Sequence, residues 1–251
     1  MSGKVHLVGA GPGAADLLTL RAARLLADAD IVFHDALVNP EILALAEKAK
    51  LVPVGKRCGK HSTVQAFINK QLVDAAAKYR VIVRLKGGDP MLFGRAQEEI
   101  DALAAAGIAV EVVPGITAAL AASASLKVSL TRRGISRNVA FVTPRVGKTE
   151  QASDWVASAL AADTAVIYMG AGEADAIAQT FIERGRAAGT PVALIESASL
   201  PAEQWHFGRL RDLGVLAQKL GAGPAIIVLG EVLRERAQAE ARVRSLLQKA
   251  G

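Results

Sequence analysis

The sequence predicts an α/β protein of two α/β domains, with a mostly parallel first sheet, a mixed second sheet and a ligand cleft between them. Two observations predict this class. Short apolar runs rich in β-branched residues alternate with alanine-rich helical stretches along the whole chain, which is typical of βαβ units. An arginine-bearing polar segment, LTRRGISRN (130–138), leads into a second set of such runs. We place the domains at 1–114 and 115–251.

Each domain is expected to hold five strands. The expected strands are KVHLV (4–8), DIVF (30–33), KLVPV (50–54), RVIVRL (80–85), AVEVV (109–113), NVAFVT (138–143), TAVIYM (164–169), PVALI (191–195), QWHFG (204–208) and PAIIVLG (224–230). Helical patterns between them include 19–29 and 63–78, and Ser62 is a good N-cap for the second. No helical stretch directly precedes QWHFG, so we expect antiparallel strands in the second sheet. The tail, 234–249, predicts an exposed helix of mixed charge.

Composition limits the classes of function. The single cysteine, Cys58, excludes an internal disulfide and fits a reducing cytoplasm. The start shows no signal-peptide layout, and no apolar run approaches the ~20 residues of a membrane span, so we expect a cytoplasmic protein with no membrane partner. A net charge of +6 favours an anionic partner, but 4% aromatic residues disfavour nucleic-acid binding by base stacking. No Cys/His cluster has metal-ligand spacing, and no metal is expected.

The first glycine motif suggests a nucleotide. Gly9, Gly11 and Ala14 satisfy the dinucleotide fingerprint G-x-G-x-x-G/A, and Asp35 lies about 20 residues further on. In that fold a helix begins inside the motif, whereas here the helical pattern begins only near Thr19. An NAD(P)-dependent oxidoreductase therefore remains only an alternative hypothesis.

Two further small-residue loops follow strands. RLKGGDPMLFGR (84–95) has adjacent glycines that let a ligand approach the backbone, and its acid, Asp89, can accept hydrogen bonds from a ribose or an ammonium group. PGITA (114–118) follows the next strand. Loops after the first, fourth and fifth strands are expected to line one carboxyl edge of the first sheet, where open α/β sheets bind ligands.

These motifs resemble a known family in order and spacing. VGAGPG (8–13), LLTLRAARLL (17–26), HDALV (34–38), VGKRCGKHS (54–62), LKGGDPMLFGR (85–95), VVPGITAA (112–119), LTRRG (130–134), YMG (168–170) and PAIIVLGEV (224–232) are similar to segments of uroporphyrinogen-III C-methyltransferases, which are tetrapyrrole methylases. The resemblance implies an active-site cleft between two domains, a homodimer, and S-adenosyl-L-methionine as methyl donor, with S-adenosyl-L-homocysteine as product. It implies C-methylation of uroporphyrinogen III at C-2 and C-7 to give precorrin-2.

The resemblance also implies roles for particular residues. Asp35 corresponds to the catalytic base and Lys56 to its acidic partner. Contacts to S-adenosylmethionine carry over to Pro12, Gly87, Gly88, Asp89, Leu92, Thr117, Ala118, Met169, Ala198 and Ala225. Because the substrate carries eight carboxylates, arginines are expected to bind it, with Glu98 orienting one of them or accepting pyrrole N–H groups. These candidates are Arg95, Arg132, Arg133, Arg137 and Arg57.

Departures from the family pattern fall mainly on the acceptor side. Ala36 stands where an arginine usually follows the base, Arg132 stands where histidine is usual, Pro144-Arg145 replaces a glycine-histidine pair, and AQEE (96–99) replaces GGEE. We hypothesise that Arg132 compensates for Ala36. The alternatives are a methylase of another tetrapyrrole intermediate, an RNA methylase and, without catalysis, a basic nucleic-acid-binding module.

Overall fold

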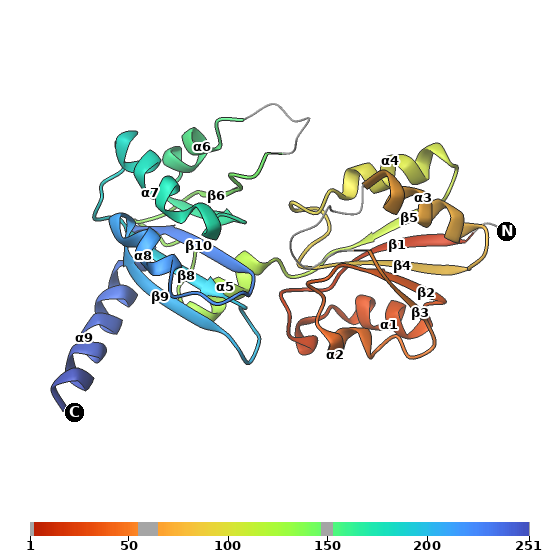
Figure 1. Ribbon diagram of the computed structural model, residues 1–251, viewed down its shortest axis with the longest axis horizontal. Coiled ribbons are helices and arrows are strands. Elements are labelled where there is room, and N and C mark those ends of the chain that lie inside the picture. The colour runs from red at the N-terminus through yellow and green to blue at the C-terminus, as the bar shows by residue number, and fades with distance from the viewer. Residues whose placement is uncertain (1–2, 55–64, 147–152, 251) are drawn as a thin grey trace. The chain divides into compact units, whose positions relative to one another are not determined.

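The computed structural model describes residues 3–54, 65–146 and 153–250, and it groups the chain into two compact units, Met1–Ala118 and Ala119–Gly251. The boundary expected from the sequence lies between residues 114 and 115. Each unit contains one five-stranded sheet with helices packed against it (Figure 1). All ten expected strands are present, and the two-sheet α/β class is confirmed.

The first unit contains a fully parallel sheet in the order β3-β2-β4-β1-β5. Its strands are β1 (Lys4–Gly9), β2 (Ile31–His34), β3 (Lys50–Pro53), β4 (Val81–Lys86) and β5 (Val110–Val113). Its helices are α1 (Leu20–Asp28), α2 (Pro40–Leu43), α3 (Gln65–Ala76) and α4 (Ala96–Ala105), with a short 3-10 helix at Ala15–Leu17.

Alternating side chains of these strands fill two cores. Val5 and Leu7 of β1 pack with Leu72 of α3 in one cluster, whereas Val8 packs with Leu26 of α1 in the other. Helices α3 and α4 thus cover one face of the sheet, and α1 and α2 cover the other (Figure 1). Burial on both faces explains why the inner strands β1, β2 and β4 are largely apolar.

Helix α1 begins directly after its N-cap residue, Thr19. The Thr19 hydroxyl oxygen accepts the backbone N–H of Ala22 at 3.2 Å, and the segment before it forms only the 3-10 helix. The predicted late start of this helix is confirmed, so no α-helix begins within the first glycine motif. Ser62, expected to cap α3, lies outside the described residues.

The second unit contains a mixed sheet in the order β6-β7-β10-β8-β9. Its strands are β6 (Val139–Val142), β7 (Thr164–Tyr168), β8 (Pro191–Glu196), β9 (Gln204–Arg209) and β10 (Ala225–Gly230). Only β6 and β7 pair in parallel, whereas β10 runs antiparallel to β7 and β8, and β9 antiparallel to β8. The antiparallel strands expected from the sequence are confirmed.

The helices of the second unit are α5 (Ala118–Leu126), which starts at the unit boundary, α6 (Trp155–Ala161), α7 (Ala174–Glu183), α8 (Leu213–Ala217) and α9 (Arg234–Ala250). Short 3-10 helices lie at Ala171–Glu173, Leu210–Asp212 and Glu231–Leu233. Phe181 of α7 is fully buried beside Trp155 of α6 and Leu213 of α8, so these three helices share one core. The charged tail forms α9, as predicted.

Candidate functional site

Three backbones pack directly against one another at the carboxyl edge of the first sheet. A Cβ on Gly115 would lie 2.3 Å from the carbonyl oxygen of Gly88, and a Cβ on Gly9 would lie 2.6 Å from the Cα of Gly115. Gly11 and Gly88 also exchange two backbone hydrogen bonds, of 3.1 and 2.7 Å. Because β4, β1 and β5 are neighbours, their loops share one edge, as predicted. We call Gly9, Gly11, Gly88 and Gly115 the glycine edge.

Asp89 ties two of these loops together. Its Oδ2 accepts the backbone N–H of Gly115 at 2.9 Å, and its Oδ1 accepts that of Met91 at 2.8 Å. The sequence predicted that the Asp89 carboxylate accepts hydrogen bonds from a ligand. In the structure, part of its hydrogen-bonding capacity instead holds the loop after β4 against the loop after β5.

The backbone of the loop after β4 is open to a ligand. Gly87 is exposed, and the Cβ it lacks would meet only the Cβ of Leu37, at 3.8 Å. Gly88 has a φ of +67°, a left-handed conformation that favours glycine. The other residues predicted to contact the donor in this part of the chain are all partly buried: Pro12 after β1, Leu92 after Asp89, and Thr117 and Ala118 where α5 begins.

Asp35 lies directly after β2 and is bound to a buried arginine. Arg84 donates from Nη2 to Oδ1 of Asp35 at 2.6 Å, from Nε to Oε1 of Glu99 at 3.1 Å, and from Nη1 to the carbonyl oxygen of Leu85 at 3.1 Å. The side chain of Arg84 is 3% exposed and that of Asp35 is 32% exposed. All three guanidinium nitrogens are engaged, so Arg84 is held firmly while Asp35 stays accessible.

Glu99 of α4 is fully buried and joins this pair to a second cation. It accepts hydrogen bonds from Lys86 Nζ at 3.1 and 3.2 Å and from the amide of Gln65 at 3.1 Å, besides the bond from Arg84. We call Asp35, Arg84, Lys86 and Glu99 the β4 charge cluster. Its two cations and two carboxylates balance in formal charge, which buried ions require.

Lys86 is the member of the cluster whose pKa is shifted by burial. Burial lowers the pKa of Lys86, and the neighbouring Arg84 charge lowers it further, while Glu99 and Asp35 oppose the shift. Sequence reasoning missed Arg84, Lys86 and Glu99. A signal was available, because two cations at alternate positions of an otherwise apolar strand point to the same face and need a buried anion.

Arg95 and Glu98 form an exposed pair at the start of α4. Arg95 donates from Nε and Nη2 to the two carboxylate oxygens of Glu98 at 2.7 and 2.8 Å. These bonds are the main cause of a pKa of Glu98 below its usual range. Arg95 has a φ of +56°, an uncommon conformation for a residue with a side chain. Glu98 therefore contacts Arg95 directly, and the role of this pair in binding the substrate stays a prediction.

The second sheet gathers the remaining predicted donor contacts at one of its edges. Met169 follows β7, Ala198 lies two residues after β8, and Ala225 begins β10. Since β10 lies between β7 and β8 and runs antiparallel to both, these three positions share an edge of the sheet. Met169 is 45% exposed, which excludes its alternative interpretation as a core residue.

Strained backbone marks the same edge. Met169 has a φ of +56°, and Ser197 and Ser199 on either side of Ala198 have φ values of +52° and +72°. Side chains rarely adopt such conformations, and clusters of them occur at ligand sites and switch regions.

The candidate arginines of the second unit lie at its surface. Arg132 donates to Glu235 of α9 at 2.9 Å, and Arg133 and Arg137 are exposed. The bond to Glu235 raises the pKa of Arg132 above its ordinary value. Lys56, Arg57 and Cys58 lie outside the described residues.

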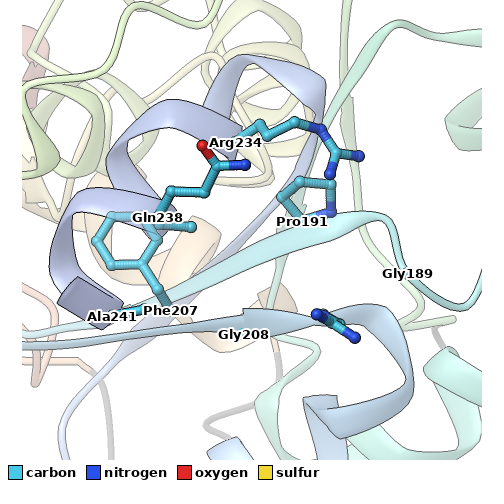
Figure 2. Close-up of a pocket in the computed structure, with 9 residues that line it drawn as sticks. Gly189, Pro191, Phe207, Gly208, Arg234, Gln238 and Ala241 are labelled. Carbon is cyan, nitrogen blue, oxygen red and sulfur yellow. The ribbon is translucent and has the colours of Figure 1, made fainter. Parts of the chain in front are cut away.

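A pocket of about 230 Å³ lies between α9 and the strands β8 and β9. Figure 2 shows Arg234 and Gln238 of α9 on one side of it and Pro191 and Phe207 on the other. None of the binding or catalytic residues predicted from the sequence lines this pocket, which lies at the start of β8 and the end of β9, away from the sheet edge that holds Met169, Ala198 and Ala225.

Within 3–54, 65–146 and 153–250, no three His, Cys, Asp or Glu side chains are grouped so that they could hold a metal ion. Within those same ranges, no helix is long and apolar enough to cross a membrane.

Comparisons with known proteins agree on one family. Residues 4–214 match the family described as Tetrapyrrole (Corrin/Porphyrin) Methylases. The chain is 48% identical over 239 residues to the uroporphyrinogen-III C-methyltransferase of Pseudomonas aeruginosa, covering 94% of this chain and 96% of that one. The crystal structure of uroporphyrin-III C-methyl transferase from Thermus thermophilus complexed with S-adenyl homocysteine matches with a TM-score of 0.81 and 39% identity, over 92% of this chain and 99% of that one.

The chain is also similar to part of longer proteins. It is 46% identical over 231 residues to the siroheme synthase of Zymomonas mobilis, covering 92% of this chain but 49% of that protein. The chain therefore spans about half the length of the siroheme synthases it matches.

Proposed function

The chain belongs to the tetrapyrrole methylases, and we propose that it is a uroporphyrinogen-III C-methyltransferase. In this proposal it transfers methyl groups from S-adenosyl-L-methionine to C-2 and C-7 of uroporphyrinogen III and produces precorrin-2 and S-adenosyl-L-homocysteine. The observation that carries the proposal is the glycine edge, where closely packed loops leave backbone open to a ligand. It is supported by 48% identity to a protein named for this activity, over nearly the whole of both chains.

The residues at the glycine edge fit the methyl donor. A nucleoside with an amino-acid tail needs backbone groups that it can approach closely, and the exposed backbone of Gly87 and the glycine at position 88 provide them. When bound, S-adenosylmethionine supplies a methyl group activated on a sulfonium. We propose that the chain holds it through Pro12, Gly87, Gly88, Asp89, Leu92, Thr117, Ala118, Met169, Ala198 and Ala225.

The chain's own chemical task is to align the acceptor and remove a proton. Alignment of reacting groups supplies about 7–11 kcal/mol of barrier reduction in favourable cases. After methyl transfer to a pyrrole carbon the ring must lose a proton, which needs a positioned base. We propose Asp35 as that base, because it is a partly exposed carboxylate at the same sheet edge with one oxygen bound by Arg84. Lys56 is proposed as its acidic partner.

Substrate binding is assigned to exposed cations. Arg95, Arg132 and Arg133 are proposed to bind carboxylates of the tetrapyrrole, since a guanidinium pairs with a carboxylate through two parallel bonds. Arg95 already makes such a fork with Glu98, so its guanidinium is held ready while Glu98 keeps acceptor capacity for pyrrole N–H groups. Arg132 would have to exchange Glu235 for a substrate carboxylate.

We further propose a cytoplasmic homodimer that acts on a small-molecule tetrapyrrole and binds neither nucleic acid nor membranes. The single Cys58 supports a reducing compartment, and the family resemblance supports the dimer. Size-exclusion chromatography with light scattering tests the dimer, which a monomeric mass at micromolar concentration would contradict.

The activity is tested by anaerobic incubation with uroporphyrinogen III and S-adenosylmethionine, with the products resolved by mass. Two added methyl groups are expected. One methyl group would place the effect of the Ala36 and Arg132 departures at the second transfer. Unmodified substrate with tight binding of S-adenosylhomocysteine would support the second candidate, a methylase of another tetrapyrrole, which those same departures favour.

A further inference from the structure

The β4 charge cluster contains groups that the proposed reaction does not use. Arg84 and Glu99 are nine-tenths or more buried, and Arg84 is the one member that touches both Glu99 and the accessible carboxylate of Asp35. Burying such a group is costly unless it is fully paired, and an apolar side chain would fill the same strand position without that cost. Its presence at the end of β4, beside Asp35, calls for a functional reason.

We infer that Arg84 is a positioning residue that fixes the orientation of the Asp35 carboxylate for proton removal. This inference depends on the proposed function, in which Asp35 is the base. Arg84 is itself immobile, because Glu99 binds its Nε and the carbonyl oxygen of Leu85 binds its Nη1. The remaining Nη2 then holds Oδ1 of Asp35 at 2.6 Å.

The consequence falls on the second oxygen of Asp35. Among the residues that the structure describes, none donates a hydrogen bond to Oδ2. With Oδ1 held, the rotation of the carboxylate is restricted, and Oδ2 is the oxygen left to take the proton. A base whose acceptor atom is fixed in this way avoids the loss of about 10²-fold in rate that follows a displacement of about 1 Å.

Glu99 makes this arrangement possible by occupying Lys86. Without Glu99, Asp35 would be the single carboxylate facing two buried cations, and Lys86 would compete with Arg84 for it. Glu99 instead takes Lys86 with both oxygens, at 3.1 and 3.2 Å, so Arg84 is left to Asp35. Burial, and then Arg84, lower the pKa of Lys86, while Glu99 and Asp35 oppose that shift.

Arg84→Lys is the first test, in the full-length chain. A lysine keeps the positive charge but has one nitrogen, so it cannot bind Glu99 and Asp35 in fixed directions at once. We expect kcat to fall by about 10²-fold, while the KM for uroporphyrinogen III and the Kd for S-adenosylhomocysteine change less than threefold. An unchanged kcat, or a loss confined to KM, would overturn the inference.

A double-variant comparison separates positioning from stability. If Arg84 acts through Asp35, the double variant Asp35→Ala with Arg84→Lys has the same kcat as Asp35→Ala alone. Multiplied losses would show that Arg84 acts elsewhere and would overturn the inference. If Asp35→Ala alone keeps the kcat of the unsubstituted chain, the assignment of Asp35 as base in the proposed function fails, and the positioning role fails with it.

Lys86→Met is the matched control within the same cluster. It removes a buried cation from Glu99 but leaves both bonds of Arg84 to carboxylates in place. We expect a lower unfolding temperature with a loss of kcat below fivefold. If Arg84→Lys does not fold, Glu99→Gln replaces it, because it weakens the anchor of Arg84 without touching Asp35. A tenfold loss of kcat with unchanged Kd is then expected, and a loss no larger than that of Lys86→Met would overturn the inference.

Discussion

Gly115→Ala is the sharpest test of the glycine edge. The new Cβ would lie 2.3 Å from the carbonyl oxygen of Gly88 and 2.8 Å from the Cα of Gly9. Ordinary contact begins near 3.4 Å, so the backbone at Gly88 must retreat by about 1 Å. The obstacles are backbone atoms on two neighbouring loops, and no side chain can rotate away to make room.

The free-energy cost follows from what this retreat breaks. Gly88 is held to Gly11 by two hydrogen bonds, and each such bond contributes about 0.5–1.5 kcal/mol. Inserting a methyl group into packed structure costs about 1–3 kcal/mol by itself. These two estimates describe the same displacement, so we expect a loss of about 2–3 kcal/mol in the free energy of unfolding.

Thermal unfolding followed by far-ultraviolet circular dichroism measures the effect. The expected fall in Tm is about 5–10 °C. Calorimetric titration should show S-adenosylhomocysteine binding weakened at least tenfold, because the proposed cradle has moved by about 1 Å. Gly9→Ala approaches the same contact from the other side and should behave alike.

Gly172→Ala is the matched control. No atom lies within 4 Å of the Cβ it would gain, and its φ is not in the left-handed region, so its Tm and binding should not fall. If Gly115→Ala changes Tm by less than 1 °C and leaves the Kd unchanged, direct backbone packing is not what shapes this edge.

Three further predictions address single contacts. Tyr168→Phe removes the oxygen that accepts the Ala119 N–H at 3.2 Å and should lower the free energy of unfolding in urea by about 1 kcal/mol. The control Tyr79→Phe, whose hydroxyl has no hydrogen bond within the described ranges, should leave that free energy unchanged. Equal effects of the two substitutions would contradict this prediction. Asp89→Ala removes the acceptor of two backbone N–H groups and should weaken S-adenosylhomocysteine binding at least tenfold by calorimetry, whereas an unchanged Kd would refute its role in shaping the loop. Burial lowers the pKa of His6 below 6.5, so the unfolded chain takes up the proton first and stability should decline as pH falls from 6.5 to the folded value; His6→Gln should flatten that decline in urea unfolding at pH 7.5 and 5.5, and a parallel decline would refute it.

Local patterns predicted the secondary structure well. The inner strands β1, β2 and β4 of the first sheet are largely buried, so each contains an apolar run that stands out from the alanine-rich helices around it. The helical pattern predicted that α1 begins near Thr19, and the structure shows that the Thr19 hydroxyl caps this helix. Apolar runs and helix starts depend on residues that are close together in the sequence, so they can be read from the sequence alone.

The sequence predicted that these glycines allow close approach to the backbone, but not which group approaches each of them. Adjacent glycines after a strand indicate that something approaches the backbone, and at Gly87 the space is open for a ligand. At Gly9 and Gly115 the approaching group is instead the backbone of another loop. Nothing in the local sequence distinguishes these two uses of glycine.

By itself the sequence determined the order of strands and helices, the loops with ligand-binding character and, through resemblance, Asp35 as the candidate base. Only the tertiary structure decided which charges meet. Arg84 lies on β4, Glu99 on α4, and Asp35 directly after β2, 64 positions before Glu99. The parallel pairing of β2 with β4 and the packing of α4 against the sheet bring the three side chains together. The physical reason is that a buried charge must be paired with a counter-ion that is close in space. That counter-ion can be far away in the sequence, so the residues next to the charge do not identify it.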